Sequence, residues 1–152
     1  MKKFVILILS IAVVGLVAAD EQDDEANTLK CLIQFLETKG VTEDFFSSVD
    51  KRTDSNVDCE HLINVKLTRA YGKIHDKLKA DSFFAKYATC IMNAIKTESN
   101  KVVILQREAI KLNGLGVKVW NYFNQKEHLD ELKKNVENSI NKAASERCVT
   151  VY

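Results

Sequence analysis

The sequence predicts an all-α fold, a disulfide-stapled bundle of five or six helices, and three observations support this prediction. The 152 residues include no proline and only five glycines, whereas β-sandwiches need frequent turn residues. Apolar residues recur at intervals of three and four positions, the spacing of one face of a helix. Four cysteines, an even number that can pair completely, lie in these helical segments behind an apolar leader.

The leader is typical of a signal peptide that is removed on export. Two lysines precede the aliphatic run Phe4–Leu16, and small residues lead up to a cleavage site after Ala19. The 16 residues from Phe4 to Ala19 fall short of the roughly 20 that a membrane-spanning helix needs. We therefore expect a signal peptide over residues 1–19 and one secreted, extracellular helical domain over residues 20–152.

The charge of the mature chain restricts its partners. Two of the 22 basic residues lie in the leader, so 133 residues remain, with 20 basic and 21 acidic side chains and a net charge of −1. Nucleic-acid-binding domains usually carry a basic excess, and electrostatic docking to a membrane requires a basic patch. We expect the mature protein to bind neither nucleic acid nor membrane.

The first predicted helix has a clear apolar face and a clear end. Its inward positions follow the i, i+3, i+4, i+7 rule, and Lys39-Gly40 is a typical helix stop. These inward positions are Leu29, Leu32, Ile33 and Leu36. A polar linker over Val41–Val57 follows, in which Phe45 and Phe46 are expected to form a helical turn that packs into the core, since two exposed phenylalanines would be costly.

The next two helices begin at predicted caps. Asp58 is placed to cap a long second helix whose apolar stripe runs from Cys59 to Leu78. Asp81-Ser82 offers a new cap for a third helix, with its apolar face between Phe84 and Ile95.

Two or three further elements complete the expected bundle. Ser99-Asn100 precedes a fourth helix that is expected to stop at Asn113-Gly114. A short aromatic element near Leu115–Asn124 is expected before a last helix that runs from Leu129 toward Cys148.

Four cysteines allow three pairings, of which we favour Cys31–Cys59 with Cys90–Cys148. The first bridge would join the first helix to the start of the second across the linker, and the second would join the third helix to the end of the last. Zinc ligands usually come in pairs two to four residues apart, whereas these cysteines are 28, 31 and 58 positions apart. We expect no metal and no other cofactor.

No residue pattern points to catalysis. The three histidines, His61, His75 and His128, lie in polar helical positions, and the chain contains no metalloprotease, nucleophile-elbow or P-loop motif. The acidic residues are spread among lysines, as on solvated helix faces. We expect no catalytic residue and no enzyme.

The apolar residues leave two functional hypotheses open. Rings and one thioether are concentrated in the middle and later helices, where they would either fill the core or line an interhelical pocket for a small hydrophobic ligand. The candidate lining residues are Phe84, Tyr87, Met92, Trp120 and Phe123. The alternative is an extracellular interaction or structural protein without a small-molecule ligand, acting through an exposed helix face or the Val41–Val57 linker.

The order of motifs resembles a family of small secreted four-cysteine helical proteins of flies and related insects. The resemblance rests on Cys31 through Gly40, on Cys59, on Ala88 through Met92, and on Cys148. It implies secretion and a helical fold, and it implies no activity and no functional residue. The architecture is also similar to that of four-cysteine insect odorant-binding proteins, which carry small hydrophobic molecules, although their last two cysteines usually lie closer together.

Overall fold

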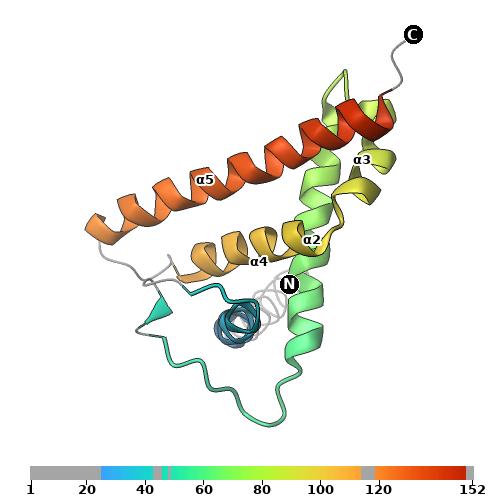
Figure 1. The fold of residues 1–152 in the computed structure, drawn as a ribbon. Coiled ribbons are helices and arrows are strands. Elements are labelled where there is room, and N and C mark those ends of the chain that lie inside the picture. The colour runs from blue at the N-terminus through green and yellow to red at the C-terminus, as the bar shows by residue number, and fades with distance from the viewer. Residues whose placement is uncertain (1–24, 43–45, 48, 114–118, 150–152) are drawn as a thin grey trace, which may run out of the picture.

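The computed structural model describes residues 25–42, 46–47, 49–113 and 119–149, and of residues 119–125 only the backbone. These residues form five α-helices and no strand (Figure 1), so the predicted all-α fold is confirmed. The predicted signal peptide over residues 1–19 and the cleavage after Ala19 lie outside the described residues.

The first helix covers residues 25–38 of the described chain and ends where the Lys39-Gly40 pair predicts. Gly40 has a φ of 75°, the left-handed conformation in which glycine is favoured. Its N–H donates to the Glu37 carbonyl at 3.0 Å, and the Val41 N–H donates to the Leu36 carbonyl at 2.9 Å. These two bonds form a Schellman motif, which satisfies carbonyls that the end of a helix leaves without partners.

The linker that follows is partly attached to the core and to the first helix. Phe46 is buried in the same apolar cluster as Leu32 and Leu36, as predicted, whereas Phe45 lies outside the described residues. Lys51 forms an ion pair with Glu37, with 2.6 Å between Nζ and the nearer carboxylate oxygen.

Helix α2, Cys59–Ala80, begins at the predicted cap. The Asp58 carboxylate accepts a hydrogen bond from the His61 N–H at 3.1 Å. Such a side-chain bond satisfies one of the free N–H groups of the first helical turn.

The third helix is shorter than predicted. The Asp81 carboxylate does act as a cap, because it accepts from the N–H groups of Phe83 and Phe84 at 2.8 and 3.1 Å. The next residues form a single 3-10 turn, Ala85–Tyr87, and α3 covers only Ala88–Ile95.

Helix α4, Glu98–Asn113, begins at a different cap from the one expected and ends as predicted. Thr97, not Ser99 or Asn100, lies before the helix, and its hydroxyl accepts from the Asn100 N–H at 3.2 Å. Both Ser99 and Asn100 are inside the first turn. The side-chain amide of Asn100 donates a hydrogen bond to the Ile95 carbonyl at 3.0 Å.

The predicted short aromatic element is not separate over its described residues, 119–124, so the prediction is wrong there, and residues 115–118 lie outside the described part. Helix α5 runs without a break over Val119–Ala143 and continues as a π-helical turn over Ala144–Cys148. No proline or glycine occurs between Val119 and Cys148, so no residue interrupts the hydrogen bonds of the helix.

The helices pack around three neighbouring apolar clusters. Helix α4 contacts both α2 and α5, while α3 contacts α2, α5 and the π turn that continues α5 (Figure 1). One cluster joins the first helix to α4, the second joins α3 to the end of α5, and the third lies between α2, α4 and α5.

Both predicted disulfides are present. The Cα atoms of Cys31 and Cys59 are 5.2 Å apart, and those of Cys90 and Cys148 are 5.7 Å apart. The first bridge joins the first helix to α2, and the second joins α3 to the end of the π turn. Stable disulfides are typical of proteins from an oxidising compartment.

Among the described helices, none combines the length and the apolar character that crossing a bilayer requires.

Candidate ligand pocket

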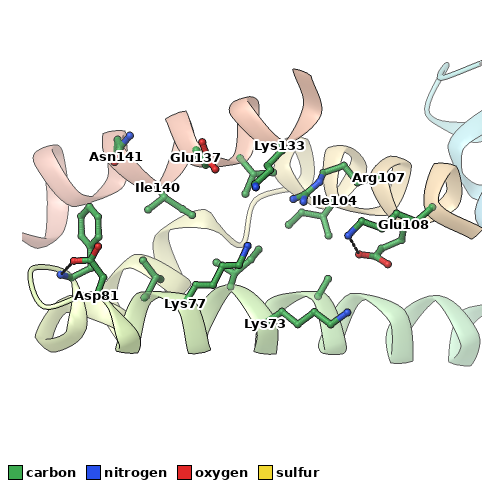
Figure 2. A pocket seen from close by; sticks show the side chains of 16 residues that line it. Lys73, Lys77, Asp81, Ile104, Arg107, Glu108, Lys133, Glu137, Ile140 and Asn141 are labelled. Atoms are coloured by element: carbon green, nitrogen blue, oxygen red, sulfur yellow. Dashed lines mark hydrogen bonds and ion pairs between the residues drawn. The ribbon is translucent and has the colours of Figure 1, made fainter. Parts of the chain in front are cut away.

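A pocket of about 430 Å³ lies between helices α2, α4 and α5 (Figure 2). Its walls come from segments that are distant in the sequence, so it exists only when the bundle has assembled. The volume falls within the range of about 300–1,000 Å³ that is usual for small-molecule sites.

The floor of the pocket is aliphatic. Three of its residues come from α2 at intervals of four, which places them on one face of that helix. Two more come from α5, also four apart, and one from α4. These floor residues are Ala70, Ile74, Leu78, Ile104, Val136 and Ile140. Ala70, Ile104 and Val136 are buried against one another as the third apolar cluster, and Ile74 and Ile140 pack against it.

Charged side chains border this floor. Five are cationic and three anionic, so the pocket carries a net charge of +2. The cations are Lys73, Lys77, Arg107, Lys111 and Lys133, and the anions are Asp81, Glu108 and Glu137. All four lysines are exposed, which shows that the pocket opens to solvent along this border.

Most of these cations have no carboxylate partner among the side chains that the structure describes. Within the described part of the chain, the one ion pair at the pocket joins Lys111 to Glu108, at 3.5 Å. The Asp81 carboxylate is occupied by the N–H groups of Phe83 and Phe84.

Arg107 is the most enclosed of the cations. Its Nε atom is buried and has no hydrogen-bond partner among the described residues. Figure 2 shows its side chain extending from α4 toward that of Lys133 on α5. The guanidinium therefore brings a donor and a positive charge to the place where the apolar floor meets the charged border.

The five predicted lining residues do not share one pocket in the structure. Phe84 lines this pocket, and Tyr87 packs partly buried in the apolar cluster beside it. Met92 is buried in that cluster and borders a different pocket, together with Tyr71. Trp120 and Phe123 belong to α5, but their side chains are not among those described.

The floor has a signal in the sequence. Ala70, Ile74 and Leu78 lie on the apolar stripe that predicts α2, and Lys73 and Lys77 recur at the same interval of four beside that stripe. This spacing alone is also that of a helix with one buried and one solvated face. Only the packing of three helices brings the lysines to the edge of a pocket.

Two further pockets, each of about 380 Å³, are more open to solvent than the pocket between α2, α4 and α5. One lies beside the Cys31–Cys59 bridge and the other beside His75. In the second, burial raises the pKa of Tyr71, and the nearby Glu98 carboxylate adds to this effect.

The three histidines do not come together. The His128 ring contacts the Gln106 side chain at 3.2 Å and the Glu131 carboxylate at 3.6 Å. Within the described ranges, no three histidine, cysteine, aspartate or glutamate side chains are grouped closely enough to hold a metal ion.

Comparisons of the chain with protein-family models, with curated proteins and with solved structures found no match. The two resemblances noted in the sequence therefore stay predictions, and the pocket itself is the basis for a functional proposal.

Proposed function

We propose that this protein is a secreted, non-enzymatic carrier of a small apolar molecule, which it holds in the pocket between α2, α4 and α5. One observation carries the proposal: three helices enclose about 430 Å³ above a continuous aliphatic floor. Burial of apolar ligand surface against such a floor contributes about 25 cal/mol per Å² to the free energy of binding, before the cost of association is subtracted.

The covalent frame supports a role outside the cell. The two disulfides join α2 to the first helix and α3 to the end of α5, so each helix that contributes two or more residues to the floor is covalently attached to a neighbour. A pocket whose walls are held in place loses less entropy when a ligand binds. The leader and the disulfides together favour export into an oxidising compartment.

The proposal is tested by filling the pocket. Ala70→Leu would place a larger side chain in the floor, and Ile74→Phe would narrow the pocket from a half-buried position on the same helix. We expect both variants to lower the affinity for the neutral fluorescent probe N-phenyl-1-naphthylamine. Ala80→Leu, at an exposed position of α2 outside the pocket, is the control and should bind as the wild type does. Circular dichroism would establish that each variant is folded.

If the wild type binds the probe saturably and the variants at positions 70 and 74 bind it equally well, the ligand lies elsewhere. Absence of saturable binding by the wild type would refute the carrier function.

A second candidate, an extracellular interaction protein, is favoured by one observation. Phe83 is 60% exposed, the largest exposure of any large apolar side chain in the described chain. Its ring lies 5.2 Å from that of Phe84 and 6.4 Å from that of Tyr87. If this aromatic group binds a protein, Phe83→Ser should abolish stoichiometric capture of that partner from the native fluid and leave probe binding unchanged.

A further inference from the structure

The charge at the pocket differs in sign from that of the chain around it. The border carries a net charge of +2, whereas the expected mature chain has a net charge of −1. Lys111 is neutralised by its ion pair with Glu108. Four cations then remain at the pocket against two carboxylates, those of Asp81 and Glu137. The four cations are Lys73, Lys77, Arg107 and Lys133. A site with this charge selects an anion over a neutral or cationic ligand.

Arg107 gives the anion a definite position. Arg107 Nε is a buried donor without a partner within the described residues, so no other described group holds this end of the guanidinium. The guanidinium also presents a planar pair of N–H groups that match the two oxygens of a carboxylate. Because Arg107 extends toward Lys133 in Figure 2, an anion between them would contact two cations.

The floor indicates what the anion is attached to. Ala70 and Leu78, with Ile74 between them, are eight positions apart on α2, which corresponds to an apolar track of about 12 Å at 1.5 Å per residue. The side chains of the track are aliphatic, and its length matches an unbranched alkyl chain of medium length.

We infer that the carried molecule is an aliphatic carboxylate, with its head group held by Arg107 and Lys133 and its alkyl chain lying along the floor of α2. This inference rests on the proposed carrier function and adds the chemical class of the ligand. Lys73 and Lys77 strengthen the attraction at the border, and their long apolar stems can cover the chain.

The test compares dodecanoate with dodecanol, which share an alkyl chain and differ in the head group. The affinity of each compound is measured by its displacement of N-phenyl-1-naphthylamine from the intact, disulfide-bonded protein, at neutral pH and below the critical micelle concentration. We expect dodecanoate to bind at least about tenfold more tightly, the factor that one charge-assisted hydrogen bond supplies. Arg107→Gln should reduce this preference to about twofold or less and leave the affinity for dodecanol unchanged.

Two further variants complete the design. Arg69→Gln removes an exposed arginine of α2 that does not line the pocket, and it should keep the full preference. Lys133→Gln, at an exposed position that the fold does not depend on, should lower the preference severalfold even if Arg107→Gln fails to fold.

The outcomes separate the two proposals. Equal affinity for dodecanoate and dodecanol in the wild type would overturn the carboxylate assignment and leave the carrier function standing. Saturable probe binding that neither compound displaces would also overturn the carboxylate assignment alone, whereas absence of saturable probe binding would overturn both proposals. A loss of both affinities in Arg107→Gln, together with an unchanged preference in Lys133→Gln, would show that these two cations do not bind the head group.

Discussion

The bridge between Cys90 and Cys148 is expected to contribute more to stability than any single contact of the bundle. It closes a segment of 58 residues between α3 and the end of the π turn. In the chain-entropy treatment, a loop of this length stabilises the folded state by about 4.2 kcal/mol at 25 °C. Cys90 is exposed and Cys148 is half-buried, so replacing both by alanine removes little packing and isolates the effect of the cross-link.

We therefore expect the variant Cys90→Ala/Cys148→Ala to lose about 4 kcal/mol of unfolding free energy. For a domain of this size, such a loss lowers the melting temperature by on the order of 15 °C. Urea unfolding followed by circular dichroism under non-reducing conditions measures the change. Thr89→Ala, at the exposed position next to Cys90, is the matched control and should stay within about 0.5 kcal/mol of the wild type.

A loss below about 1 kcal/mol in the alanine pair would refute this reasoning. It would mean that the unfolded chain gains little freedom when the bridge is absent, or that the bridge does not form. Mass spectrometry of the intact wild-type protein, before and after reduction, distinguishes these two explanations.

The remaining predictions concern the core, a helix end and one titrating group. Ile104→Ala removes a fully buried side chain from the floor between α2, α4 and α5. Chemical denaturation should show that the free energy of unfolding falls by about 2–5 kcal/mol. A fall of less than about 1 kcal/mol would mean that Ile104 is not packed as described. Gly40→Ala adds a Cβ to a residue in the left-handed conformation, with no atom within 4 Å of the new carbon. The backbone strain alone should lower the free energy of unfolding by about 1–2 kcal/mol in the same assay. An unchanged free energy of unfolding would contradict the Schellman geometry. A side-chain hydrogen bond from Arg52 lowers the pKa of Asp50 from its ordinary value of 3.8 to about 2, so the stabilisation from this contact is present above pH 3.8 and is lost as the pH falls through 2. Carboxyl NMR should show the low midpoint in the wild type and a return toward 3.8 in Arg52→Gln, and a wild-type midpoint near 3.8 would disprove the contact.

Helix ends that depend on a local residue could be predicted from the sequence. Gly40 and Asp58 act where their chemistry requires, and Asn113 is the last residue of α4, as predicted. The prediction was wrong where two local signals compete. Thr97 and Ser99 are both good caps, and the Asn100 bond to the Ile95 carbonyl favours a start at Thr97, which no single-residue preference reveals.

The aromatic segment shows a second limit of sequence reasoning. Its composition suggested a separate element, yet nothing in the sequence interrupts the backbone between it and Leu129. Helix α5 therefore continues through both, because a helix stops only where a residue or a packing contact makes another conformation more favourable.

The pocket could be predicted only in part. A pocket between helices is one of the two alternatives that the aromatic residues leave open, and Phe84 does line one. The floor consists of smaller aliphatic residues such as Ala70 and Val136, because large side chains at those positions would fill the space. Which helix faces meet, and so where the space remains, depends on packing angles that apolar periodicity does not specify.

The central claim is that an alkyl chain lies on the floor between α2, α4 and α5, and isoleucine methyl groups report on this directly. Ile74, Ile104 and Ile140 line the pocket, whereas Ile33 and Ile91 are buried in the two other apolar clusters. With methyl-labelled isoleucine and bound dodecanoate, we predict intermolecular nuclear Overhauser effects from the alkyl chain to the first three residues and none to the other two. Contacts to Ile33 or Ile91 without contacts to the pocket residues, or no intermolecular contacts at saturating dodecanoate, would contradict the account.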